Sequence, residues 1–479
     1  MILRALSIIA GVATLFALMT GQALVQENWP NNVLYHSEKS WGQKYRDQWG
    51  HWKIGLTPKG QNSAWDIEDG SSNPVTVAFI DSGLDYQHPR IARENIWVNR
   101  KEIAGNRRDD DNNGFVDDVI GWNFIDRNNN PWDEDGHGTF TAGIIAATIS
   151  DKEGIAGINR GVKIMPLKAL NAMGRGSIAH ILPAIIYAAD NGARIVNISI
   201  EQLDTEQSQA LQWAVDYAFK KGVLVVVAAG NQGRDTGAIS PSGVKHVLAV
   251  AGTDTTDKRM GFSNWGKAIR LAAPAEEILS LRARRTDLLL MAGTRDYKRG
   301  RSFLGEDAKY YHATGTSFSA PFVSGVASLI LAKRPNLSPV QLERMLTMSA
   351  DDVEDPGWDR LTGYGRLNAR KALEADPDYF LYSELHTVAP ARKDGKAVVQ
   401  LSGSVSGSNL DRFEVQLGEG TSPTTWRPMF TQRGQSVEGG DIGTFPVSEI
   451  TRRGHWTVRL LAYDRDNKMR ESRGSLNVQ

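Results

Sequence analysis

The sequence predicts an α/β domain built on a doubly wound parallel sheet, followed by a smaller all-β domain. Between residues 75 and 254, short apolar runs alternate with helical patterns, which is typical of a parallel sheet covered on both faces. After Pro377 the helical patterns stop, and strand-like runs separated by Gly- and Ser-containing turns follow. The chain has 479 residues, more than one hydrophobic core usually serves, so two domains are expected.

The strands of the first domain are predicted from near-continuous apolar runs. A strand buried on both faces lacks the polar alternation of a strand in a one-sided sheet. Five runs meet this description: VTVAFI from residue 75, VKIMPL from 162, ARIVNISI from 193, VLVVVAA from 223 and HVLAVAG from 246. We expect this domain to cover residues 45–376.

The helices of this domain are predicted from apolar residues at helical spacing. One such stripe runs from Ile178 to Ala189 and is typical of a helix packed on a sheet. Two further helical patterns cover residues 317–332 and 338–349. Helices between buried strands are what a doubly wound sheet requires.

The C-terminal region, residues 380–479, is predicted to form a small β-sandwich of the immunoglobulin or fibronectin type III kind. Residues 396–401 and 455–463 have the alternation of antiparallel strands. In the second run, Trp456, Val458, Leu460 and Ala462 share one face. Thr457 and Arg459 fall on the other face.

The N-terminus has the features of a secretory signal. Arg4 is followed by an apolar run over residues 5–19 and then by Gly21-Gln22-Ala23, which predicts cleavage after Ala23. The alternative is an uncleaved membrane anchor, but the run is short for a span of about 20 residues. We therefore expect a secreted protein, extracellular or periplasmic, in which residues 24–44 form a short extension.

Composition restricts the classes of partner and of site. The formal net charge is zero, with 55 basic and 55 acidic residues, so no nucleic-acid partner and no membrane contact beyond the export signal are expected. The chain has no cysteine, which excludes disulfides, thiolate nucleophiles and cysteine-ligated zinc. A monomer is expected.

Four segments place a polar side chain at a strand end or a helix start. Asp81 ends the run AFID, and His137 in DGHGT opens an apolar helix. Asn231 ends the most hydrophobic strand in AAGN, and Ser317 in GTSFSAP stands at the head of a helix. In open α/β sheets ligands bind beyond the carboxyl ends of the strands, so these side chains are expected to share one rim.

These residue types suit nucleophilic catalysis. A serine hydroxyl needs a base to take its proton, and His137, neutral near pH 7, could supply it. Asp81 would orient the imidazole, while the Asn231 amide and the Ser317 N–H would bind an oxyanion. Each residue alone also fits an ordinary helix cap, turn or loop position. The four together, in one α/β domain, favour the catalytic interpretation.

The segments FIDSGLDYQHP, DGHGTFTAGI, AAGNQG and GTSFSAPFVSG resemble the four sequence blocks of the subtilisin-like serine proteases. The resemblance implies a parallel sheet of about seven strands and hydrolysis of peptide bonds in proteins or peptides through an acyl-enzyme. It gives Asp81, His137 and Ser317 the roles of the catalytic triad and Asn231 that of the oxyanion donor.

The same resemblance implies a substrate cleft with two walls. Gly174, Arg175 and Gly176 correspond to the edge that pairs with the substrate backbone, and Ser199 and Ile200 to the opposite wall. The alternative for both segments is an ordinary connection between a strand and a helix.

Two positions depart from the family pattern. Glu201 stands where the family usually has glycine, so it either narrows the pocket for the P1 side chain, favouring basic residues there, or points to solvent. Phe140 stands where many relatives have a second histidine, and its side chain has no group that could take part in the reaction.

Residues 109–118, DDDNNGFVDD, are dense in oxygen ligands around a glycine. Asp109, Asp111, Asn113 and either Asp117 or Asp118 are predicted to bind a structural calcium ion. Clustered carboxylates repel one another, and a hard divalent cation would relieve that repulsion. The alternative is an acidic turn capped by its own side chains.

Two rival functions are less well supported. An inactive binding or scaffold protein could keep the same fold, but all four chemical residues are present. A serine-carboxyl peptidase would have Glu in place of the His137 base and Asp in place of Asn231.

Overall fold

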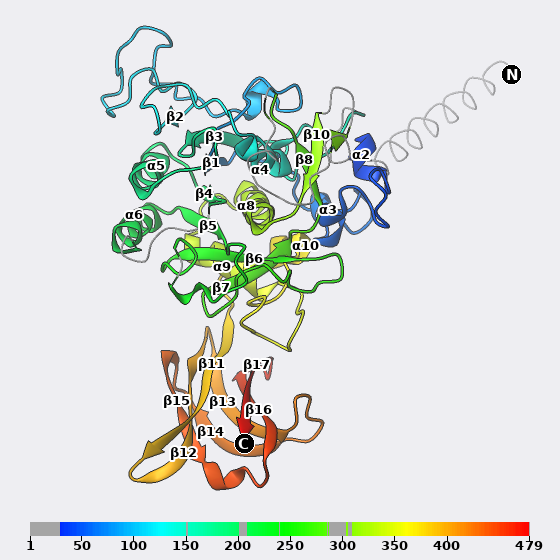
Figure 1. Cartoon of the computed structure of the whole chain (residues 1–479), viewed down its shortest axis with the longest axis vertical. Coiled ribbons are helices and arrows are strands. Elements are labelled where there is room, and N and C mark those ends of the chain that lie inside the picture. The colour runs from blue at the N-terminus through cyan, green and yellow to red at the C-terminus, as the bar shows by residue number, and fades with distance from the viewer. Residues whose placement is uncertain are drawn as a thin grey trace, which may run out of the picture.

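The computed structural model describes residues 29–149, 152–200, 208–238, 240–284, 286, 303–304 and 309–478. In Figure 1 the α/β part occupies the upper portion of the molecule, and the strands that follow residue 380 form a separate all-β part below it. Both parts of the predicted fold class are therefore confirmed.

The α/β part is built on a sheet of seven strands in which every neighbouring pair is parallel. Their order is β2-β3-β1-β4-β5-β6-β7. The strands are β1 (Thr76–Asp81), β2 (Trp122–Asn123), β3 (Lys163–Lys168), β4 (Ile195–Ile198), β5 (Leu224–Ala228), β6 (Val247–Thr253) and β7 (Ile269–Pro274). The five predicted runs are β1, β3, β4, β5 and β6, whereas β2 and β7 were not predicted.

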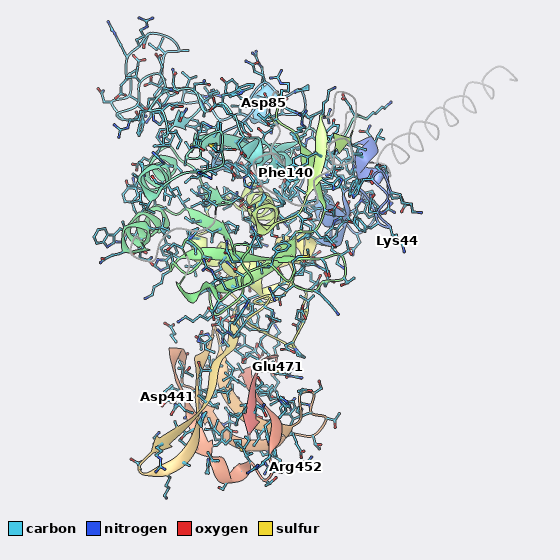
Figure 2. All side chains as sticks on the ribbon, viewed as in Figure 1. Lys44, Asp85, Phe140, Asp441, Arg452 and Glu471 are labelled. Carbon is cyan, nitrogen blue, oxygen red and sulfur yellow. The ribbon has the colours of Figure 1, made fainter. Side chains whose placement is uncertain are left out.

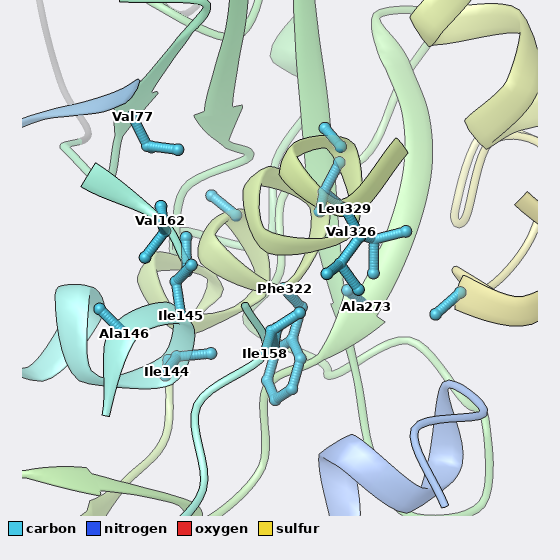
Figure 3. Packing of buried hydrophobic residues seen from close by; sticks show 14 of the residues in the cluster. Val77, Ile144, Ile145, Ala146, Ile158, Val162, Ala273, Phe322, Val326 and Leu329 are labelled. Carbon is cyan, nitrogen blue, oxygen red and sulfur yellow. The ribbon is translucent and has the colours of Figure 1, made fainter. Parts of the chain in front are cut away.

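Helices cover both faces of this sheet. α5 (Ile178–Asp190) and α6 (Ser208–Lys220) pack on one face, and α4 (His137–Ala146) and α8 (Thr316–Lys333) on the other. Successive residues of β1 point to opposite faces, so Val77 and Phe79 join the α4–α8 core while Ala78 and Ile80 join the α5–α6 core. Figure 3 shows residues of the α4–α8 core packed around α8.

α8 is the central helix of the molecule. Within the described residues it is the one helix long and apolar enough to cross a membrane, but 89% of that stretch is buried inside the protein. A glycine on α8 permits its close approach to the chain after α4, because a Cβ at Gly325 would lie 2.7 Å from Ile158 Cδ1. Its apolar composition is thus that of a core helix.

Residues 29–66 pack on the α/β part, and their helices are α2 (Val33–His36), α3 (Trp49–Lys53) and η1 (Ala64–Asp66). The Asn32 side-chain amide donates to the carbonyls of Thr148, Glu153 and Ile155. Tyr35 is fully buried in the core of the α4–α8 face.

The remaining elements of the α/β part are short. A small antiparallel sheet contains β8 (Ile278–Leu281), β10 (Tyr310–Ala313) and β9 (Phe303–Leu304). Two helices follow α8, namely α9 (Pro339–Met348) and α10 (Ala369–Glu374), and the 3-10 turns are η2 (Arg93–Asn95) and η4 (Thr236–Ala238). Before α10, residues 364–367 run beside β7, where the Leu367 N–H donates to the Ala272 carbonyl.

The C-terminal part consists of two antiparallel sheets, β11-β12-β15 and β14-β13-β16-β17. The strands are β11 (Leu381–Lys393), β12 (Lys396–Gly407), β13 (Leu410–Glu419), β14 (Arg427–Arg433), β15 (Val437–Pro446), β16 (Gly454–Asp464) and β17 (Met469–Val478), with η6 (Val447–Glu449) after β15. Residues of both sheets form one apolar core. Trp456, Val458, Leu460 and Ala462, which were predicted to share one face, are all buried in it.

Charged side chains join the two parts. Arg270 of β7 contacts Glu384 of β11 at 2.7 Å and Glu343 of α9 at 2.9 Å. Its guanidinium also lies 5.0 Å from the ring centre of Tyr364. Farther along the junction, the Trp358 N–H donates to the carbonyl of Glu471 on β17, a residue labelled in Figure 2. The two parts are thus held together by specific polar contacts.

Candidate active site

An aspartate and a histidine meet where β1 ends and α4 begins. The Nδ1 atom of His137 lies 2.8 Å from Oδ1 of Asp81. Asp81 is fully buried, and its carboxylate also accepts hydrogen bonds from the Ser82 N–H and the Thr141 hydroxyl. With Nδ1–H donating to the carboxylate, the imidazole presents Nε2 as its proton-accepting atom.

Two glycines let α4 approach the end of β1. A Cβ at Gly138 would lie only 2.1 Å from the carbonyl oxygen of Gly83, so any larger residue would push the two segments apart. Gly136, directly before the histidine, has φ +110°, a conformation that favours glycine. These residues explain the glycine-rich sequence around His137.

Asp133 anchors the same corner and was not predicted. Its carboxylate accepts hydrogen bonds from the Ser82 hydroxyl and from the N–H groups of Gly136 and Thr139. The fully buried side chain thereby ties the turn after β1 to the first turn of α4. The sequence feature that could have indicated Asp133 is the acidic run Asp133-Glu134-Asp135 directly before Gly136.

Ser317 lies at the N-terminus of α8 and faces the end of β4. Its Oγ donates to the Ser199 carbonyl at 3.1 Å, and the Ser199 hydroxyl donates to the Ser317 carbonyl at 2.7 Å. The ring of Phe318, the next residue, lies 5.8 Å from the His137 ring. The structure therefore brings the start of α8 beside the start of α4, with the serine hydroxyl bonded to Ser199 and not to His137.

Asn231 lies against the same end of α8. Its Oδ1 accepts hydrogen bonds from the N–H and the hydroxyl of Thr316, at 2.9 and 3.0 Å. The preceding Gly230 has φ +100°, and its N–H donates to the Thr316 hydroxyl. Because the oxygen end of the amide faces Thr316, the orientation of the Asn231 side chain is fixed.

Carboxylates dominate the electrostatics of the site. Burial disfavours the imidazolium, but the charge and hydrogen bond of Asp81, with the charges of Asp135 and Asp133, outweigh it and raise the pKa of His137 to about 9. Burial is also the main reason that the pKa of Asp135 is raised to about 6. His137 is therefore mostly protonated at pH 7, which differs from the expectation that it is neutral there.

The residues expected to line a substrate cleft follow β3 and β4. Gly174, Arg175 and Gly176 lie in an exposed turn, where the Arg175 carbonyl accepts the Asn171 N–H at 2.9 Å. Ser199 and Ile200 directly follow β4 and are buried. Glu201 lies outside the described residues.

Phe140 occupies the interior beneath the site. Its side chain, labelled in Figure 2, is fully buried. The centre of its ring lies 4.3 Å from that of Phe318 and 4.8 Å from that of Tyr311. It acts as a packing residue between α4, α8 and β10.

Part of the predicted metal loop forms a carboxylate cluster. Carboxylate oxygens of Asp109 and Asp111 lie within 4.8 Å of each other and of Glu102, which was not predicted. Asp117 is placed differently, since its two oxygens accept the N–H groups of residues 105–107. Asn113 donates its amide to Asp118, a fully buried carboxylate.

A model of the subtilase family matches residues 72–365. This chain belongs to that family. The thermophilic serine proteinase of Bacillus sp. (strain AK1) is 33% identical over 310 residues, covering 65% of this chain and 64% of that protein. Thermitase of Thermoactinomyces vulgaris is 32% identical over 313 residues, covering 65% of this chain and 92% of that protein.

A solved structure described as a lanthipeptide protease is similar to this chain with a TM-score of 0.54 and 28% identity. The similarity covers 68% of this chain and 94% of that one. Family membership confirms the expected enzyme class, a subtilisin-like serine endopeptidase. The match to the Bacillus proteinase spans slightly less than two thirds of that protein.

Proposed function

We propose that this subtilase cleaves peptide bonds with Asp81, His137 and Ser317 as its catalytic triad and Asn231 as an oxyanion donor. The observation on which the proposal rests is the 2.8 Å contact between His137 Nδ1 and Asp81, beside the N-terminus of α8, whose second residue is Ser317.

The reaction follows from the chemistry of these groups. Ser317 Oγ attacks the carbonyl carbon of the scissile bond while His137 Nε2 takes the hydroxyl proton. Asp81 stabilises the imidazolium that results. The proton then passes to the departing amine, and water hydrolyses the acyl-enzyme by the same steps in reverse.

The negative oxygen formed by the attack needs hydrogen-bond donors. The N–H of Ser317 belongs to the first turn of α8, where backbone N–H groups have no partner within the helix. The amide of Asn231 is held beside that turn by Thr316. Two donors at the positive end of a helix dipole would stabilise the oxyanion.

The serine hydroxyl must turn before it can react. In the structure it donates to the Ser199 carbonyl at the end of β4. Rotation about the Cα–Cβ bond of Ser317 moves Oγ between staggered positions without moving α8. We propose that a bound substrate, which pairs with the walls of the cleft, favours the rotamer that faces His137.

Labelling with a fluorophosphonate tests the triad, because the probe reacts with an activated serine. The wild-type protein should be labelled and should cleave a casein substrate, and Ser317→Ala should lose both properties. Ser319→Ala, two residues along α8, is the matched control and should keep labelling. Labelling that persists in Ser317→Ala would refute the assignment of the nucleophile.

We further propose that residues 1–23, which lie outside the described residues, direct export and are removed, and that the mature protein is a monomer. The proposed domain limits remain 45–376 and 380–479. N-terminal sequencing of protein collected outside the producing cells should begin at Leu24. A retained N-terminus, or a protein recovered only with membranes, would contradict this.

We propose calcium as a structural ion at Glu102, Asp109 and Asp111. The donor set fits a hard cation, since it consists of carboxylates, and Asp111 Oδ1 is buried without a hydrogen-bond partner among the described residues. Bound calcium would neutralise this cluster. Thermal unfolding should occur at a higher temperature in calcium than in chelator, and Asp111→Asn should remove most of the difference; equal midpoints for the wild-type protein would reject the site.

A further inference from the structure

Asn231 lies in a loop and not in a helix or strand. β5 ends at Ala228, and η4 begins at Thr236. Around Asn231, Gly230 has φ +100° and Gly233 has φ +65°, conformations that favour glycine. Because glycine backbone is permissive, the local sequence leaves the course of this loop loosely determined. Contacts from other segments must therefore fix it.

Asn264, in the connection between β6 and β7, supplies such contacts from a fully buried position. Its Oδ1 accepts the N–H groups of Gln232 and Arg234, both at 3.1 Å. Its Nδ2 donates to the Ala229 carbonyl at 3.0 Å and to Oε1 of Gln232 at 2.8 Å. A side-chain amide has two acceptor sites and two donor hydrogens, so the whole hydrogen-bonding capacity of Asn264 is used on this loop.

The contacts of Asn264 lie on both sides of Asn231 in the sequence. The backbone N–H of Asn264 also donates to the Gly230 carbonyl at 2.9 Å, so the residues directly before and directly after Asn231 are both held. The later part of the loop has a separate contact, since the Trp265 N–H donates to the Arg234 carbonyl at 3.0 Å. Loss of the Asn264 side chain should therefore loosen the part around Asn231 and leave the rest of the loop in place.

We propose that Asn264 is a positioning residue, which holds the backbone from which the Asn231 amide reaches the oxyanion. The inference rests on the proposed function, because it takes Asn231 as the oxyanion donor. Asn264 is fully buried and has no exposed atom with which to touch a substrate. The oxyanion forms only as the reaction proceeds, so a misplaced donor lowers kcat and has little effect on KM.

The size of the effect follows from the geometry that oxyanion stabilisation requires. The donor must lie about 2.7–3.1 Å from the oxyanion, and a displacement of about 1 Å can cost about 100-fold in rate. Asn264→Ala removes every side-chain bond to the loop. We therefore expect kcat to fall about 10- to 100-fold, with KM changed less than about twofold.

A double-mutant cycle tests whether Asn264 acts through Asn231. Steady-state kinetics on one peptide p-nitroanilide would give kcat and KM for the wild-type enzyme, Asn231→Ala, Asn264→Ala and the double variant. No donor is left to misplace once Asn231 is alanine. Adding Asn264→Ala to Asn231→Ala should therefore lower kcat by less than about twofold, whereas two independent effects would multiply.

Asn95→Ala is the matched control for a general loss of stability. Asn95 is also buried, and its amide donates to the carbonyls of Arg160 and Val162 at 2.9 and 2.8 Å. Val162 directly precedes β3, so these bonds lie at the opposite end of the parallel sheet from Asp81, which ends β1. Asn95→Ala should lower Tm and keep the wild-type kcat.

The outcomes separate this inference from the proposed function. The positioning role is overturned by an unchanged kcat in Asn264→Ala, by a loss that recurs in full in the Asn231→Ala background, or by an equal loss in Asn95→Ala. If Asn231→Ala itself kept the wild-type kcat, the oxyanion assignment would be refuted as well. Should Asn264→Ala fail to fold in a thermal scan, Asn264→Ser would take its place in the cycle, because its hydroxyl can still bond to the loop.

Discussion

Replacing Arg270 by methionine tests whether the contacts between the two parts of the molecule stabilise the fold. The guanidinium lies between Glu384 and Glu343, and the three side chains are only 18%, 9% and 29% exposed. The substitution keeps an apolar stem but leaves the buried Glu384 without its cation. Removing one partner of a buried ion pair costs about 3–5 kcal/mol.

The pKa of Glu384 gives an independent measure of the free energy that its ion pair with Arg270 contributes to stability. Burial alone would raise it, but the charge of Arg270 and hydrogen bonds from His386, Tyr364 and Arg270 outweigh burial and lower it from 4.5 to about 2. That depression corresponds to about 3 kcal/mol in favour of the folded, ionised form, at 1.36 kcal/mol per pKa unit. We therefore expect Arg270→Met to lower Tm by roughly 6–12 °C, at about 2–4 °C per kcal/mol.

The assay is thermal unfolding at pH 7 in the Ser317→Ala background, so that self-digestion does not distort the curve. Arg427→Met is the matched control, since its pair with Glu449 is 46% and 41% exposed and should contribute no more than about 1 kcal/mol. A loss below about 1 kcal/mol in Arg270→Met would refute the reasoning. Since the folded pKa of Glu384 is depressed, its contribution is complete above pH 4.5 and should disappear as the pH falls toward 2.

Three further predictions concern the catalytic groups. Asn231→Ala should lower kcat about 10²–10³-fold with little change in KM, and steady-state kinetics showing an unchanged kcat would argue against the oxyanion role. Because His137 has a pKa of about 9 and must be neutral to accept a proton, kcat/KM should rise about tenfold per pH unit from pH 7 and level off near 9; a plateau already reached at pH 7 would contradict this. Gly138→Ala should reduce kcat/KM at least about tenfold, since its Cβ would meet the Gly83 carbonyl at 2.1 Å, whereas Gly261→Ala, with open space around it, should behave as wild type.

The sequence predicted the strands that are determined by the pattern of their own residues. Five of the seven parallel strands were found because a strand buried on both faces is apolar along its whole length. The other two have weaker local signals. Strand β2 has only two residues and exists through its pairing with Leu167 and Lys168, while β7 contains Arg270, which a purely apolar criterion rejects.

In the candidate site, too, the sequence predicted the positions of the functional residues but not the contacts around them. Asp81, His137, Asn231 and Ser317 could be predicted because the strand ends and helix starts of this fold are readily located. The contacts around them depend on side-chain packing between distant segments. For this reason neither the bond of the Ser317 hydroxyl to Ser199 nor the raised pKa of His137 was predicted.

Residues brought together from different segments were missed for the same reason. Glu102 joins Asp109 and Asp111 only because the loop folds back on itself, and it lies outside the dense acidic run. The pair Arg270–Glu384 spans 114 positions and links two domains. No spacing within either segment indicates such contacts.

The course of residues 364–367 along β7 has a consequence for an enzyme surrounded by unfolded polypeptides. The outermost strand of a sheet offers backbone groups with which such chains readily associate. Here those groups are already engaged, because the Tyr364 N–H donates to the Arg270 carbonyl and the Ala272 N–H to the Gly365 carbonyl. A further strand could therefore pair with this stretch of β7 only if residues 364–367 moved away from it.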